Sequence, residues 1–188
     1  SWIIKVWTLK TPGSDLVKVK GLRVVESSMS GMVKYLEDPN TCDDVGCYDA
    51  FVMEELPTPP MHYAAYSSWK FALPFPFNHR EAQTLVLHQQ DPVTKEVLLD
   101  IIATPNKIKP DLCCVRLTHL HNKWRFTPVG DGKIEIELTQ DMDLGGNMPG
   151  FLTSMMVPET TFKVMTDIVE HLKMDKFRNA KIDYVVEP

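Results

Sequence analysis

Apolar and polar residues alternate in short stretches from residue 2 to residue 142, a pattern typical of strands with one buried and one exposed face. The clearest case is 133–142, where isoleucine and leucine alternate with acidic and hydroxyl residues. The Gly-Asp-Gly sequence at 130–132 predicts a hairpin before it, and His121 and Asn122 predict a second tight turn. The pattern predicts strands at residues 2–9, 16–26, 51–55, 61–70, 81–90, 97–104, 112–121, 123–128 and 133–142.

Apolar residues recur every three or four positions in two other segments, as they do on one face of a helix. Residues 28–36 predict a short helix that Ser27 or Ser28 can cap. Residues 149–174 predict a long amphipathic helix that contains Pro158. Because proline removes a backbone hydrogen bond, we expect either a kink there or two abutting helices.

A run of strands followed by one long helix predicts an α+β fold, in which a curved antiparallel sheet wraps around the C-terminal helix. That helix is the only predicted element long enough to cover the apolar face of the sheet, and a cavity remains if the two do not close fully. The length of 188 residues fits one domain, 1–188, with a core at about 4–175 and a tail at 176–188. Within the tail, 181–186 is expected to be a short edge strand or disordered.

The composition is that of a globular protein, with 44% hydrophobic and 24% charged residues. The formal net charge of −5 argues against a general nucleic-acid-binding surface. No apolar run approaches the ~20 residues of a membrane-spanning helix, and no signal peptide is visible. Since the chain starts at Ser1, a leader could have been removed, so cytoplasmic and exported locations both stay open. The 10 methionines are an unusual number for this length, and methionine suits surfaces that adapt in shape.

Four cysteines are too few for a disulfide scaffold. Cys42 and Cys47 flank a loop-like stretch and could form a small bridge, although two free thiols are the simpler expectation. Cys113 and Cys114 are adjacent in a predicted strand, so we expect them to point to opposite faces as small buried apolar residues.

Three stretches of the chain resemble START domains, the lipid-transfer modules related to steroidogenic acute regulatory protein. WKFALPFPFNHRE at 69–81 is similar to the aromatic–Pro–Phe–Pro segment of that family, which is followed by an arginine and an acidic residue. KWRFTPVGDG at 123–132 is similar to its Trp-x-Phe-x-Pro hairpin. DLGGNMPGFL at 143–152 is similar to its Gly-Gly entry into the last helix, with Phe151 where many members have tryptophan. The three motifs occur in the family's order and spacing, from about Ile4 to Leu172.

The resemblance implies a helix-grip fold that holds one hydrophobic ligand, typically a lipid or sterol, in a tunnel between the sheet and the last helix. Some sterol-binding members have an acid–arginine pair in the tunnel. Aligned without gaps on Arg80, this sequence has Ser67 and Val86 near those positions, so the polar anchor for sterol is missing.

The predicted ligand-binding residues form an apolar wall with one basic group. Methionine and phenylalanine suit a wall that accepts different ligand shapes, although the same side chains would also serve as ordinary core. If Arg116 faces inward, it could receive a phosphate or carboxylate head group, whereas an outward Arg116 is a solvated strand residue. The ligand-binding set is Arg116, Ile136, Phe151, Met155, Phe162, Met165 and Val169.

No sequence motif predicts a catalytic residue, a cofactor or a metal. His119 and His121 lie on one face of a strand, but a third metal ligand is not apparent, and exposed histidines beside a turn are the simpler expectation.

The sequence therefore predicts a module that binds one hydrophobic small molecule or lipid for transport, storage or sensing, with at most transient membrane contact and an oligomeric state left open. The main alternative is an enzyme of the polyketide cyclase or aromatase type that uses the same cavity. Such chemistry needs converging polar groups, so Arg116, Thr84, His88 and Gln140 all pointing inward would favour it, and an almost wholly apolar wall would favour carriage. A third possibility is a regulatory or interaction domain.

Overall fold

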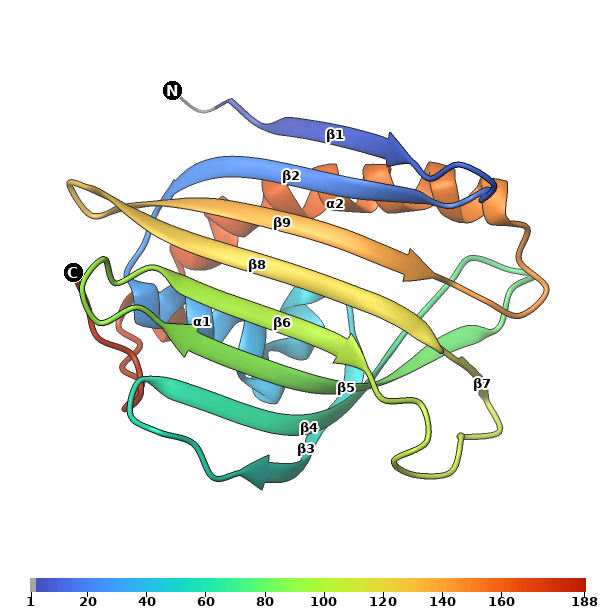
Figure 1. Ribbon diagram of the computed structural model, residues 1–188, viewed down its shortest axis with the longest axis horizontal. Coiled ribbons are helices and arrows are strands. Elements are labelled where there is room, and N and C mark those ends of the chain that lie inside the picture. Colours follow the sequence, from blue (N-terminus) through green and yellow to red (C-terminus); the bar gives the residue numbers. More distant parts are fainter. Residues whose placement is uncertain (1–2) are drawn as a thin grey trace.

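A computed structural model describes residues 3–188 and shows one strongly curved sheet with helices on its inner side (Figure 1). The strands are β1 Lys5–Lys10, β2 Val17–Glu26, β3 Tyr48–Leu56, β4 His62–Phe71, β5 His79–Gln90, β6 Val97–Ala103, β7 Cys114–Arg116, β8 His119–Gly130 and β9 Lys133–Asp143. Their order is β1-β2-β9-β8-β6-β5-β4-β3, all antiparallel, and β7 adds a short parallel pairing to β5. The early strand β2 therefore lies beside the late strand β9.

Two helices cover the inner face of the sheet, by which we mean the face turned toward α2. The helix α1 (Met29–Glu37) is capped by the Ser28 hydroxyl, which accepts a hydrogen bond from the Gly31 amide at 3.0 Å. The long helix α2 (Gly150–Leu172) runs without interruption through Pro158, so the alternative of two abutting helices is wrong. A 3₁₀ segment (Pro39–Val45) follows α1, and a short helix, α3 (Asp175–Arg178), follows α2.

The structure corrects the predicted turn at His121 and Asn122, because β8 runs straight through both residues. Asn122 pairs with Ile101 of β6 on one side and with Gln140 of β9 on the other. A residue that is paired with a strand on each side cannot form a chain reversal, although asparagine is typical of turns. The predicted strand at 112–121 is reduced to the three residues of β7 and the first part of β8.

The C-terminal tail is neither a strand nor disordered, and side chains hold it against α1 and β5. The Glu187 carboxylate accepts hydrogen bonds from the amides of Met29 and Ser30 at 2.8 and 2.9 Å. These amides belong to the first turn of α1, where backbone N–H groups have no helical partner. The Gln90 amide also bonds the backbone N–H and carbonyl of Val186.

All four cysteines are in disulfides, which corrects the expectation of free thiols. Cys42 and Cys47 lie at the end of the 3₁₀ segment, where Gly46 with φ of 82° turns the chain and brings their Cα atoms to 5.0 Å. Cys113 and Cys114 pair with each other across a turn that ends as β7 begins, so they are not opposite-facing residues of one regular strand.

Candidate ligand-binding site

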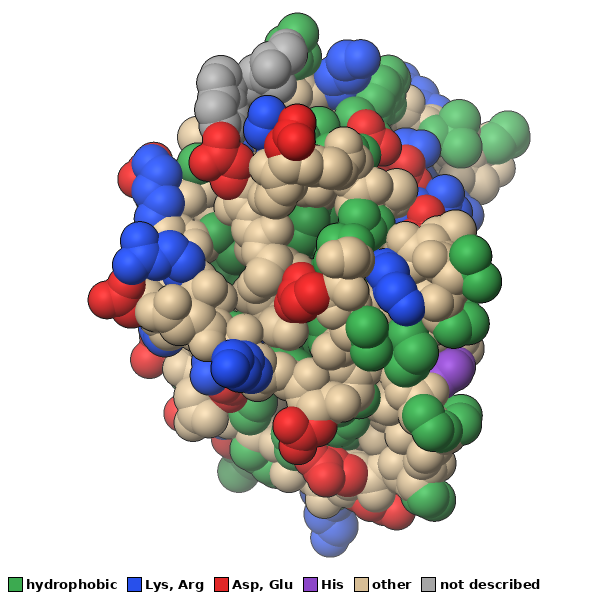
Figure 2. Space-filling model, turned by 90° about the vertical axis from the view of Figure 1, so that its left-hand side faces the viewer, with side chains coloured by type: hydrophobic (Ala, Val, Ile, Leu, Met, Phe, Trp, Pro, Cys, Tyr) green, Lys and Arg blue, Asp and Glu red, His purple; other side chains and the backbone are tan. Residues whose placement is uncertain are grey.

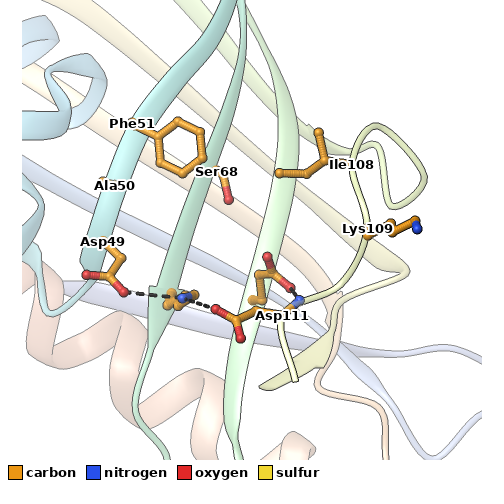
Figure 3. Close-up of a pocket in the computed structure, with 9 residues that line it drawn as sticks. Asp49, Ala50, Phe51, Ser68, Ile108, Lys109 and Asp111 are labelled. Carbon is orange, nitrogen blue, oxygen red and sulfur yellow. Dashed lines mark hydrogen bonds and ion pairs between the residues drawn. The ribbon is translucent and has the colours of Figure 1, made fainter. Parts of the chain in front are cut away.

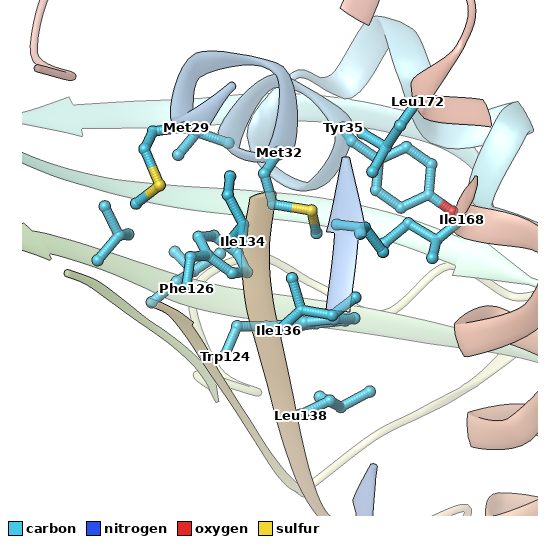
Figure 4. Close-up of a cluster of buried hydrophobic side chains, with 14 of the residues drawn as sticks. Met29, Met32, Tyr35, Trp124, Phe126, Ile134, Ile136, Leu138, Ile168 and Leu172 are labelled. Carbon is cyan, nitrogen blue, oxygen red and sulfur yellow. The ribbon is translucent and has the colours of Figure 1, made fainter. Parts of the chain in front are cut away.

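The inner face carries two separate clusters of buried apolar side chains. The first cluster lies near α1 and joins that helix to β8, β9 and the C-terminal half of α2 (Figure 4). Its largest members include Met29, Met32, Tyr35, Trp124, Phe126, Ile136, Leu138, Met165 and Ile168. The second cluster lies toward the start of α2 and consists of Leu73, Ala82, Leu117, Leu120, Leu144 and Met148, with Met142, Leu152 and Met156 packed against it. Ile101 of β6 contacts both clusters.

A glycine lets α2 approach the sheet closely. A Cβ atom added to Gly21 of β2 would lie 2.9 Å from the Thr161 methyl group and 3.0 Å from Met165 Cε. The helix turns Val157, Thr161 and Met165 toward the sheet, at a spacing of four residues. The small residue therefore sets the depth at which α2 lies over the sheet.

Polar side chains separate the two clusters along a line that we call the polar row: Thr84 of β5, Asn122 of β8, Gln140 of β9 and Thr161 of α2. Asn122 and Gln140 are directly paired across their strands. The Thr161 hydroxyl lies 2.6 Å from Gln140 Oε1 and 2.8 Å from the Val157 carbonyl oxygen. Thr84 and Thr161 are completely buried.

The row lies between the clusters on every strand that contributes to it. The inner-face neighbours of each polar residue, two positions before and two after, belong to different clusters. These neighbours are Ala82 and Val86 on β5, Leu120 and Trp124 on β8, and Met142 and Leu138 on β9.

Three of the predicted ligand-binding residues lie in or against the first cluster. Ile136 and Met165 are fully buried there. Val169 is half-buried against the same cluster and also lines a groove at this end of the molecule.

Phe151, Met155 and Phe162 lie on the exposed side of α2, which corrects their expected position on an enclosed wall. Their side chains are 60%, 66% and 52% exposed. The sequence shows a helix with apolar residues on two sides, and hydrophobicity alone does not decide which side faces the sheet. The structure buries the side that contains Thr153 and Thr161.

Arg116 is not in the inner wall either, and its guanidinium is fully occupied. It donates to Glu81 Oε2 from Nε at 3.1 Å and from Nη2 at 2.9 Å. The remaining donors bond the carbonyl oxygens of Pro105, Ile108 and Lys109. Glu81 is on the face of β5 opposite Thr84, so Arg116 ties the 104–113 loop to the outer face instead of receiving a head group.

A buried Glu37–His88 pair lies at the α1 end of the inner face, and the sequence analysis missed it. His88 Nδ1 is 2.8 Å from the Glu37 carboxylate, which also accepts a hydrogen bond from the Tyr184 hydroxyl at 2.8 Å. Burial and the neighbouring Glu37 raise the pKa of Tyr184 above its ordinary value. These partners are far apart in sequence, so no local motif could have identified them.

Two grooves open on the surface. The larger, about 1070 Å³, lies where the β8–β9 hairpin, α1 and the C-terminus meet, at the end of the molecule that Figure 2 faces. Acidic and basic side chains are interspersed over that end, so it shows no single-sign patch (Figure 2).

The smaller groove, about 610 Å³, lies between β3, β4 and the 104–113 loop (Figure 3). Lys70 bridges Asp49 and Asp111 in it, at 3.2 and 2.7 Å. The Lys70 ammonium lowers the pKa of the Asp111 carboxyl. Three of the charged side chains that line this groove are therefore paired with one another.

His119 and His121 face aspartates instead of each other. His119 Nε2 is 2.8 Å from Asp141 and His121 Nε2 is 2.6 Å from Asp100. Among residues 3–188, no three His, Cys, Asp or Glu side chains gather as metal ligands would. No helix in the same part of the chain is long and apolar enough to cross a membrane.

Neither the protein-family models nor the curated proteins match this sequence. Solved structures do match it over most of its length. A fragment of a STAR-related lipid transfer protein from Xanthomonas axonopodis is 19% identical, with a TM-score of 0.79 over 91% of this chain and 94% of that one. Human STARD10 is 15% identical, with a TM-score of 0.81 over 94% of this chain and 72% of that one. Human StAR-related lipid transfer protein 5 is 13% identical, with a TM-score of 0.78 over 90% and 82%. The protein therefore has the START fold, a curved antiparallel sheet packed against a long C-terminal helix.

Proposed function

We propose that the protein binds a single lipid-like ligand between α2 and the inner face of the sheet, for transport, storage or sensing. The observation that carries the proposal is the polar row beneath α2, which has buried unpaired atoms and lies between two clusters of buried apolar residues. The solved proteins with this fold include three named for lipid transfer, in line with the proposal.

Apolar burial is sufficient to hold such a ligand. Each methylene removed from water contributes about 0.8 kcal/mol. A chain of about a dozen methylenes would contribute roughly 10 kcal/mol before the costs of ordering are subtracted. Ile136, Met165 and Val169 are the predicted wall residues that remain in a position to line the site.

The polar side chains of the inner face do not converge as an enzyme site would require. Arg116 is on the other side of the sheet, bound to Glu81. His88 is bound to Glu37 at the α1 end, while Gln140 is beside Thr161 under the middle of α2. The four groups that would favour the cyclase or aromatase alternative therefore do not converge, because Thr84, His88 and Gln140 are spread over the inner face and Arg116 is outside it.

Native mass spectrometry of the purified protein, followed by organic extraction, tests the proposal. We expect one ligand per chain, either co-purified or taken up from vesicles of mixed lipids, and lost on extraction. A bare protein mass under both conditions would contradict the proposed function.

A further inference from the structure

Two polar atoms of the polar row have no hydrogen-bond partner although they are buried. They are Thr84 Oγ1 and Asn122 Oδ1. Gln140 Oε1 already has a donor, because the Val157 carbonyl accepts the helical hydrogen bond from the Thr161 amide and the Thr161 hydroxyl can serve Gln140. Native proteins pair nearly all buried polar groups, so two unpaired atoms on one face of the sheet mark a place where another molecule supplies the partners.

The unpaired atoms are set among apolar neighbours on both sides. On β8, Asn122 lies between Leu120 of the second cluster and Trp124 of the first. On β9, Gln140 lies between Met142 and Leu138 in the same way. A ligand that reaches the row therefore places a polar group in its middle and apolar parts at both ends.

The charged side chains of the inner face lie away from the row and are bonded to other groups, although Arg23 Nε and His88 Nε2 have no partner. The inner-face positions of β8 and β9 hold no charged residue, and those of β5 hold Arg80 and His88, each four residues (roughly 13 Å) from Thr84. Arg80 donates to the carbonyl oxygens of Asn78, Leu144 and Gly145. His88 is bound to Glu37, as described above. On β2, Arg23 donates to the carbonyl oxygens of Met165 and Thr166.

We propose that the polar row binds the hydroxyl group of an uncharged lipid, with Asn122 Oδ1 as its acceptor and the hydrocarbon parts against the two clusters. This inference rests on the proposed function and specifies its ligand. A hydroxyl supplies the donor that Asn122 Oδ1 lacks. Thr84 lies two strands and two residues away, roughly 12 Å, beyond Ile101 and Ala103 of β6, and takes a second neutral oxygen, such as an ester carbonyl. A phosphate or carboxylate at the row would be buried with the nearest inner-face arginines, Arg23 and Arg80, four residues (roughly 13 Å) away along their strands, which is unfavourable.

Vesicles of phosphatidylcholine that contain either dioleoylglycerol or its methyl ether provide the test, because the two lipids differ only in the hydroxyl group. Native mass spectrometry of the full chain gives the ratio in which they are bound. We expect the wild-type protein to prefer dioleoylglycerol about tenfold, the worth of one good hydrogen bond. Asn122→Leu should reduce that ratio to about one while the protein still binds lipid. Thr84→Val should weaken binding of both lipids equally.

Thr104→Val is the matched control, because Thr104 Oγ1 is also buried and unpaired but lies in the loop after β6, outside the row. It should leave the ratio unchanged, and circular dichroism should show all three variants folded. Equal binding of the two lipids, a preference for phosphatidylcholine, or an unchanged ratio in Asn122→Leu would overturn this inference and leave the proposed function intact. A wild-type protein that binds no lipid would contradict the proposed function itself.

Discussion

Both faces of β5 bury polar side chains, and Thr84 on the inner face is the buried polar residue of this strand whose side chain has no partner. Glu81 and Gln83 on the outer face are almost fully buried. Glu81 accepts hydrogen bonds from Arg116 and from the Asp111 amide, and Gln83 bonds both the amide and the carbonyl of Ile108. Thr84 on the inner face is equally buried and has no partner. Glu81 and Gln83 therefore hold a loop, whereas Thr84 is left without a partner.

The largest effect should come from breaking the buried ion pair of the outer face. Glu81→Leu leaves the Arg116 guanidinium buried without its carboxylate, which should lower the free energy of unfolding by about 3–5 kcal/mol. Urea unfolding measures the loss. Glu137→Leu, which removes the half-exposed pair with Lys20, is the control and should cost less than about 1 kcal/mol. Equal losses in the two variants would mean that Glu81 does not hold the loop.

Two methionines of α2 test which side of the helix is the inner one. Met165→Ala should lower the free energy of unfolding by about 2–5 kcal/mol, because Met165 is completely buried. Met155→Ala should change it by less than about 0.5 kcal/mol, since that side chain is 66% exposed. Thermal or urea unfolding compares the pair. A larger loss in Met155→Ala would reverse the assigned orientation of α2.

Gly21 tests how closely α2 approaches the sheet. Gly21→Ala should cost about 1–3 kcal/mol of unfolding free energy, because the added methyl group meets Thr161 and Met165. Gly13→Ala is an unsuitable control, since Gly13 has positive φ, so Ala82→Gly measures a one-methyl change on the inner face of β5, which is not adjacent to β2. A neutral Gly21→Ala would show that the helix lies further from β2.

The smallest effects compare the two faces of β5 directly. Gln83→Leu removes two hydrogen bonds and leaves the Ile108 amide unpaired, which should cost about 1–3 kcal/mol of unfolding free energy. Thr84→Val removes an unpaired hydroxyl, so the ligand-free protein should be unchanged or up to about 1 kcal/mol more stable. Denaturant unfolding of delipidated protein gives both values. Destabilisation by Thr84→Val would indicate that the protein itself pairs this hydroxyl.

The local patterns of the sequence predicted most of the fold. Alternation located nearly all the strands, and the three motifs pointed to the START fold that the solved structures share. The predictions failed where a residue type or a hydrophobic pattern is compatible with two different structures. Asn122 is typical of turns but lies in the middle of β8, and α2 has apolar residues on two sides.

The candidate site was less predictable, because it depends on partners distant in sequence. Arg116 bonds Glu81, which is 35 residues away in the sequence, and His88 bonds Glu37, which is 51 residues away in the sequence. No spacing rule anticipates such pairs. The polar row could not be predicted from the sequence for the same reason, since its members come together only when β5, β8, β9 and α2 pack.

Methyl NMR with a spin-labelled lipid tests the location of the ligand most directly. We expect the lipid to broaden the methyl signals of Leu120 and Leu138, which flank the polar row from the two clusters, and to leave those of exposed Val93 unchanged. Broadening confined to exposed methyl groups, with Leu120 and Leu138 unaffected, would contradict binding on the inner face.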